Sequence, residues 1–244
     1  ILHNLLKAFE LSILLLLIGL FITLALTAKH KSPDLPIMRF ACIFSNAAYM
    51  GFPLIQALFG SEGLLYASAF VTVYNILLWT AGYGIVSKKV HAKEVLRTIF
   101  TNPVLISVVA GLLIYLCQIP VPDIIKQPVS LVGNMNTPLS MFITGMIIAG
   151  SDVKGLVYNK NIWYIILVRQ LVIPAVCFGV FSLFHVTGMA AQVVLLLEAC
   201  PSAAITSVFA VQFGYDENLA AGAVVITTFF SILTLPVCAM LLTA

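Results

Sequence analysis

Charged residues are scarce in this sequence. They make up 9% of its 244 residues, whereas roughly a quarter of a soluble domain is charged, and 61% of the residues are hydrophobic. Twelve basic residues against nine acidic ones give a net charge of only +3, so we expect no nucleic-acid partner. The composition predicts a protein that resides in a membrane, with lipid as its surroundings.

Motifs for metal binding, disulfide formation and catalysis are also missing. The sequence has no CxxC and no Cys/His cluster with metal spacing, and its five cysteines all fall in apolar segments. It has no GxGD, no HExxH and no Ser/His pair within an apolar run. We therefore expect no metal, no cofactor and no enzymatic activity. The cysteines are Cys42, Cys117, Cys177, Cys200 and Cys238.

Apolar runs of about 20 residues are abundant, and that length spans a bilayer core as a helix. They predict an all-α polytopic membrane protein with eight spans in this chain. The predicted spans are residues 8–27, 35–59, 64–86, 98–118, 129–150, 161–186, 189–213 and 218–242.

Basic residues are concentrated in alternate loops between these spans. Nine of them lie in or beside the loops 28–34, 87–97 and 151–160, whereas the opposite side has only Lys7 and Lys126. Because cytoplasmic loops carry an excess of lysine and arginine, these three loops are predicted to be cytoplasmic.

Two of the predicted spans are interrupted near their middle. Span 35–59 is broken at Ser45-Asn46 and span 189–213 at Cys200-Pro201, 155 residues further on. A nearly equal offset, of 154 residues, places Phe59-Gly60 on Phe213-Gly214. Paired broken membrane helices are typical of the binding sites of secondary transporters. Two ordinary kinks remain the alternative, because Pro and Gly are common in membrane helices.

The two copies enclose an odd number of spans, which predicts inverted repeats. Residues 1–86 form a first repeat with three spans, 87–97 a cytoplasmic loop, and 98–244 a second repeat with five. Projecting the second repeat back by 154 residues leaves room for two helices before Ile1. We therefore expect ten spans in the full protein.

The breaks themselves suggest the chemistry of a site. Proline at position 201 ends a helix, and Asn46 is a favoured N-cap for the half-helix that follows it. Two half-helix starts that meet near the midplane would present free N–H groups and positive dipole ends, which favour an anion such as a carboxylate. The predicted substrate-binding residues at the breaks are Ser45, Asn46, Ala47, Pro201 and Ser202.

Polar residues inside other spans extend this prediction. Arg169 and Glu198 are the ionisable residues well inside predicted spans. We expect a buried ion pair, which either locks two helices or takes part in coupling to protons or sodium. Asn134 and Asn136 in span 129–150 either contact substrate or form hydrogen bonds between helices.

The residues at both breaks resemble the auxin efflux carrier family. The matching stretches are Phe44–Leu54, including Asn46 and Met50-Gly51-Phe52-Pro53, and Ala199–Ala203, followed by Phe213-Gly214-Tyr215-Asp216. Asn102-Pro103 and Asn136-Thr137-Pro138-Leu139 fit as well. The short 87–97 loop resembles that of bacterial members of the malate or malonate permease kind, and this resemblance implies a location in the bacterial inner (plasma) membrane.

The resemblance implies ten helices in the bile-acid-symporter-like fold, with a scaffold bundle and a transport bundle that contains crossed broken helices. It also implies elevator-type alternating access and organic anion substrates, held at a crossover onto which Asn46 and Pro201-Ser202 map. A homodimer is among the expected assemblies. The sequence leaves open the substrate (malate, malonate or an auxin-like acid) and the coupling ion (H⁺, Na⁺ or none). The alternative is an ion-coupled transporter of the same fold for a sterol-like anion or a cation.

Overall fold

The structure is a computed structural model that describes residues 2–87, 100–101, 103–150 and 158–243. Within these ranges every regular element is helical, which confirms the predicted all-α class. The elements, with η marking a π-helix, are α1 (Leu2–Leu26), α2 (Leu35–Ile43), η1 (Ala47–Gly51), α3 (Phe52–Leu77), η2 (Leu78–Gly82), α4 (Tyr83–Ser87), α6 (Pro103–Leu116), α7 (Asp123–Asn134), α8 (Asn136–Ala149), α10 (Lys160–Ile166), η3 (Leu167–Val172), α11 (Ile173–Leu183), α12 (Met189–Glu198), α13 (Ile205–Phe213) and α14 (Glu217–Thr243).

Five helical stretches in the described part of the chain are long and apolar enough to cross a membrane. They cover residues 2–26, 47–87, 123–149, 160–183 and 217–242, and two further apolar helices, 105–116 and 189–198, are shorter. The stretch 47–87 contains a turn at Gly60, whose φ of 61° is non-helical, so it consists of two helices that meet end to end. Helix length therefore supports a polytopic membrane protein, and the count of eight spans stays a prediction.

Both segments predicted to be broken are interrupted in the structure. The first leaves helical geometry after Ile43 and resumes it at Ala47. The second does so after Glu198 and resumes at Ile205. In both cases a proline or a polar residue interrupts the backbone hydrogen bonds that would otherwise join the preceding helix to the following one.

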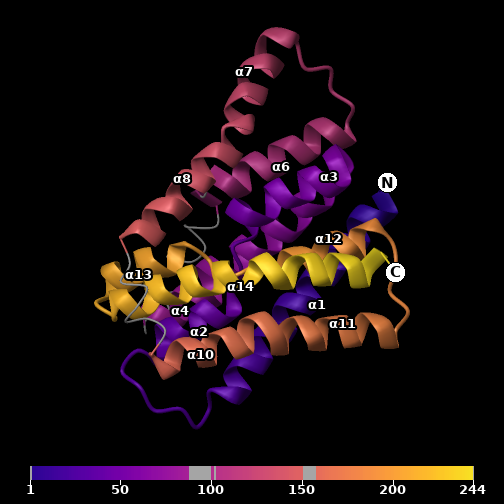
Figure 1. Ribbon diagram of the computed structural model, residues 1–244. Coiled ribbons are helices and arrows are strands. Elements are labelled where there is room, and N and C mark those ends of the chain that lie inside the picture. Colours follow the sequence, from indigo (N-terminus) through magenta and orange to yellow (C-terminus); the bar gives the residue numbers. More distant parts are fainter. Residues whose placement is uncertain (1, 88–99, 102, 151–157, 244) are drawn as a thin grey trace.

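The buried face of α1 explains how the centre of the bundle packs. Ala8, Ser12, Gly19 and Thr23 lie on that face, and α1 packs through it against α3 and α12 (Figure 1). In a membrane the hydrophobic effect does not drive helices together, so small residues that allow close backbone approach are favoured at such interfaces.

Two of the π-helical turns precede a proline. Pro53 follows the end of η1 by two residues, and Pro174 follows the end of η3 by two residues. A proline removes one helical hydrogen bond and clashes with the carbonyl four residues earlier. The wider turn relieves both effects, and η3 is where Arg169 lies.

Helix α7 extends away from the bundle, whereas α6 lies against α3 and α8 against η1 and α14 (Figure 1). The predicted span 129–150 is two helices, α7 and α8, which together begin six residues earlier than predicted, at Asp123. No residue of α7 is buried within the described structure. The predicted span 98–118 corresponds to α6.

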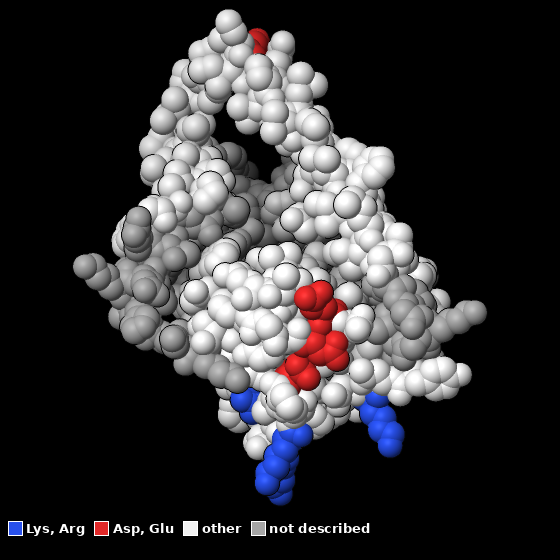
Figure 2. Space-filling view, turned by 90° about the vertical axis from the view of Figure 1, so that its left-hand side faces the viewer, with Lys and Arg blue, Asp and Glu red and all other residues white. Residues whose placement is uncertain are grey.

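Several connections meet at one end of the bundle. Asp216 donates its backbone N–H to Asp34 Oδ1 at 3.0 Å, and Tyr215 Oη donates to the carbonyl of Val86 at 2.6 Å. His30 stacks on Tyr164. These contacts place the loops around residues 30, 86, 160 and 215 together, at an end where acidic side chains gather in one cluster (Figure 2). The predicted loop 87–97 beyond Ser87 and most of the loop 151–160 lie outside the described residues.

Gly82 in η2 allows the ring of Phe44 to pack beside the first break. A Cβ atom at this position would lie 2.6 and 2.7 Å from two carbon atoms of that ring. Gly82→Ala is therefore expected to destabilise the protein by about 1–3 kcal/mol, because overpacking forces a rigid ring to move. Thermal unfolding in detergent measures this. Gly179→Ala on α11, where an added Cβ meets nothing within 4 Å, is the control; an equal loss there would contradict the explanation.

Candidate functional site

The two breaks lie against each other as paired backbone segments. Residues 44–46 and 201–203 run antiparallel, with a bridge between Ser45 and Ser202. The N–H of Asn46 donates to the carbonyl of Pro201 at 2.7 Å, and the N–H of Ala203 donates to the carbonyl of Phe44 at 2.9 Å. Backbone groups that would otherwise be unsatisfied inside a membrane thus satisfy each other.

A hydroxyl group from the helix that comes after the next turn, at Gly60 or Gly214, anchors each break. Tyr74 Oη donates to the carbonyl of Ser45 at 2.8 Å, and the N–H of Ser202 donates to Thr227 Oγ1 at 3.0 Å. Tyr74 and Thr227 are 153 residues apart, one less than the offset of 154 between Phe59-Gly60 and Phe213-Gly214. Ser202 Oγ additionally donates to the carbonyl of Ala41 at 2.8 Å, which joins the second break to α2.

Arg169 and Glu198 form an ion pair next to the paired breaks. Arg169 Nη1 lies 3.0 Å from Glu198 Oε1, and both side chains are buried. The guanidinium also donates to backbone carbonyls of both broken segments, those of Cys42, Ile43, Glu198 and Cys200. An isolated charge at this depth would be costly, so these acceptors account for its presence.

A cavity of about 380 Å³ borders both breaks at the points where the second half-helices begin. Ser45 Oγ and Asn46 Nδ2 are buried and have no hydrogen-bond partner within the described structure, although both residues line the cavity. A buried, unpartnered polar group is expensive, so a ligand that satisfied it would gain binding energy. The lining consists of Ser45, Asn46, Ala48, Tyr49, Val71, Tyr74, Asn75, Leu78, Trp79, Pro103, Ala203, Ala204 and Ile205.

The local electrostatics of this cavity favour an anion. Ala48, Ala204 and Ile205 belong to the first turns of the half-helices, and the first N–H groups of a helix have no acceptor within it. Two such helix starts border one cavity, and each carries a partial positive charge. Among the described residues that line the cavity, none is acidic.

The side chain of Asn46 does not act as the N-cap that the sequence suggested. It makes no capping hydrogen bond, and its φ of −81° and ψ of 45° are not extended. Instead, its backbone carbonyl accepts from the N–H groups of Met50 and Gly51, as the π-turn requires. The Nδ2 atom of this side chain has no hydrogen-bond partner within the described structure, and the residue lines the cavity.

The other predicted site residues fall into two groups. Ala47, Pro201 and Ser202 are buried in or next to the paired breaks but do not line the cavity. Asn136 Nδ2 donates to the carbonyl of Ala48 at 3.4 Å, so it contacts the half-helix that borders the cavity. Asn134 is exposed on α7 and lines none of this cavity.

Sequence reasoning missed the contribution of the helices that follow the breaks. Tyr74, Asn75 and Trp79 line the cavity, and Thr227 anchors the second break. The repeat offset applied to Tyr74 leads to Thr228, next to Thr227, and would have indicated both positions. Asn75 Nδ2 donates to the carbonyl of Val71 at 2.8 Å, so its amide is already partnered, unlike that of Asn46.

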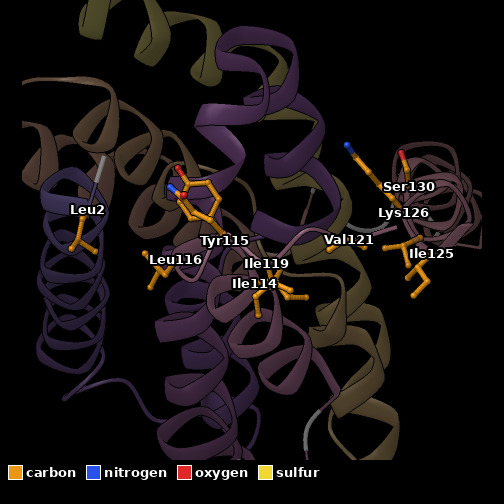
Figure 3. A pocket seen from close by; sticks show the side chains of 12 residues that line it. Leu2, Ile114, Tyr115, Leu116, Ile119, Val121, Ile125, Lys126 and Ser130 are labelled. Atoms are coloured by element: carbon orange, nitrogen blue, oxygen red, sulfur yellow. The ribbon is translucent and has the colours of Figure 1, made fainter. Parts of the chain in front are cut away.

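A second cavity, of about 1060 Å³, lies between the start of α1 and the helices α6 and α7. Ile125 and Lys126 of α7 lie across it from Leu2 and Leu116 (Figure 3). None of the predicted site residues lines it, and its walls are mostly apolar residues of α6 and α7. The paired breaks therefore mark the better candidate site.

Comparisons with known proteins find a family of membrane transport proteins and individual transporters that are similar to this chain. The model of the membrane transport protein family matches residues 3–94 and 89–239. An uncharacterized transporter of Methanocaldococcus jannaschii is 26% identical over 245 residues, which cover 95% of this chain and 78% of that protein. An uncharacterized transporter of Methanothermobacter thermautotrophicus is 22% identical over 204 residues, 83% of this chain and 66% of its own length. The match to the family model covers nearly the whole chain and agrees with the resemblance to auxin efflux carriers. The chain therefore belongs to the membrane transport protein family.

Proposed function

We propose that this protein is a secondary transporter of small organic anions, and that the cavity beside the paired breaks holds the carboxylate group of its substrate. The observation that carries the proposal is the buried, unpartnered amide of Asn46, which lies where two helix starts border one cavity. Ser45 Oγ is a second donor, and Tyr49, Tyr74 and Trp79 give the body of the substrate an apolar contact. Malate, malonate and auxin-like acids are the candidate substrates.

In this proposal the chain consists of inverted repeats, residues 1–86 and 98–244, whose broken helices cross at residues 44–46 and 201–203. Two observations support inversion. Tyr74 and Thr227 hold the two breaks at nearly equivalent positions of the repeats. Tyr66, soon after the Gly60 turn, bonds to Glu62 and lies beside Asn4, whereas residues after the Gly214 turn contact Asp34 and Val86 at the opposite end of α1.

The remaining parts of the proposal concern alternating access and orientation. Asn136 contacts the half-helix through Ala48, and we assign it, with Asn134, to the scaffold against which the crossed helices move in an elevator-type cycle. The end that holds residues 28–34 and 214–217 faces the cytoplasm, in keeping with the distribution of basic residues. A ten-span protein, a bacterial inner membrane and a homodimer complete the proposal.

Uptake into liposomes tests this function. The full-length protein is reconstituted, and labelled malate, malonate and indole acetate are offered with a proton gradient, with a sodium gradient and with neither. Saturable uptake of one anion that its unlabelled form competes away is expected. If none of these anions is taken up under any gradient, carboxylate transport is wrong and the same fold carries another cargo.

A further inference from the structure

Five oxygen atoms surround the guanidinium group of Arg169. Two are the carbonyl oxygens at the end of α2, and three come from the end of α12 and the break that follows it. The side chain of Arg169 is 0% exposed. The acceptors are Cys42 O at 3.2 Å, Ile43 O at 3.1 Å, Cys200 O at 3.1 Å, Glu198 Oε1 at 3.0 Å and Glu198 O.

This arrangement is negative before the guanidinium is counted. The C-terminal end of a helix carries about half a negative charge, and α2 and α12 both end here beside the carboxylate of Glu198. In broken-helix transporters, carbonyl oxygens of unwound backbone and half-helix ends coordinate sodium ions or protons. The ends of α2 and α12 therefore offer the ligands of a cation, and a side chain of the protein already occupies their centre.

We propose that Arg169 is a resident cation, which takes the place that an alkali cation from solution would otherwise hold between the ends of the two half-helices. The inference rests on the proposed transport function and narrows the choice of coupling ion. If Arg169 fills this position, no sodium ion binds there, and any coupling through Glu198 uses a proton. Arg169 is thus a positioning residue, which holds the breaks in the register that forms the anion cavity.

Removing the side chain tests whether the vacated place binds a cation. In the full-length protein, millimolar guanidinium or sodium chloride is expected to raise the melting temperature of Arg169→Ala by roughly 2–4 °C, whereas urea and N-methylglucamine chloride leave it unchanged. The wild type is expected to respond to none of them. A response that is absent from Arg169→Ala, or equal in the wild type, overturns the proposal.

Arg169→Lys and Arg169→Met are a matched pair that separates charge from packing. Both replacements are long and flexible, but only lysine keeps a cation among the carbonyl groups. Arg169→Lys is expected to give more folded protein and a higher melting temperature than Arg169→Met. Equal values, including equal failure to fold, overturn the proposal.

Transport supplies a separate readout. Replacing sodium by N-methylglucamine on both sides of the liposome membrane is expected to leave wild-type uptake unchanged. A sodium requirement in the wild type overturns the resident cation while leaving anion transport intact. If no anion is transported, the proposed function fails, and the melting experiments still decide whether Arg169 occupies a cation site.

Discussion

Replacing Asn46 by alanine is expected to weaken anion binding and uptake by about 10- to 150-fold. A hydrogen bond to a charged group contributes about 1.5–3 kcal/mol, and every 1.4 kcal/mol changes affinity tenfold. The amide nitrogen of Asn46 is buried and has no partner within the described structure, and the residue lines the cavity. Concentration-dependent uptake into liposomes measures the loss.

The same substitution is expected to stabilise the protein without substrate. A buried polar group that lacks a hydrogen bond costs about 1–3 kcal/mol, and Asn46→Ala removes that cost. Higher thermal stability together with weaker binding is typical of a residue kept for function. Had the amide a hidden structural partner, Asn46→Ala would lower stability instead, and its assignment to the substrate would be wrong.

Asn75→Ala is the matched control. It removes the same amide from the same cavity, but Asn75 Nδ2 already donates to the carbonyl of Val71 in its own helix. We expect a change in uptake of less than about threefold, since little more than packing against the substrate is lost. Equal losses in both variants would mean that cavity shape, and not the free amide, determines binding.

Glu198→Gln is expected to have the largest effect on stability. Breaking a buried ion pair by removing one charge costs about 3–5 kcal/mol, and glutamine keeps the size of the side chain while losing its charge. Four backbone carbonyls still accept from Arg169, so we expect the lower part of this range. Thermal unfolding in detergent measures the loss, with Glu10→Gln at an exposed position of α1 as the control.

The same variant separates coupling from structure. If Glu198 takes part in coupling, Glu198→Gln abolishes gradient-driven uptake but leaves exchange of labelled for unlabelled substrate partly intact. If the pair only locks two helices, uptake and exchange fall together. Gly19 lies close to this carboxylate, since an added Cβ would be 3.1 Å from Glu198 Oε1. Gly19→Ala should therefore disturb the ion pair and cause part of the loss of stability and uptake that Glu198→Gln causes.

The positions of the helix breaks could be predicted from the sequence because proline and small polar residues act locally on the backbone. The register between the breaks could not, because the bonds of Asn46 to Pro201 and of Ala203 to Phe44 depend on how two distant segments meet. The same limit explains Asn46. Its residue type favours an N-cap, but the π-turn that precedes Pro53 uses its backbone carbonyl and leaves its side chain free.

Burial of charge was predictable in kind but not in detail. The sequence indicated that Arg169 and Glu198 would need partners inside a membrane, and the ion pair at 3.0 Å fits that requirement. It did not indicate that Arg169 also bonds to Cys42 and Ile43, which belong to a segment more than a hundred residues away. Tyr74 and Thr227 could not be identified from the sequence either. The role of a hydroxyl group in an apolar helix depends on its hydrogen-bond partner, and here that partner lies in a distant segment.

The pairing of residues 44–46 with 201–203 also sets an order on biosynthesis. The carbonyls of Phe44, Cys42 and Ile43 obtain their partners from Ala203 and Arg169. At 5–20 residues per second, the ribosome needs roughly 8–30 s to advance from Asn46 to Ala203. During that interval the carbonyl groups of the first break lack the partners that they have in the folded protein. We therefore expect the first half of the chain to need protection from lipid and from proteolysis until the second break has been synthesised.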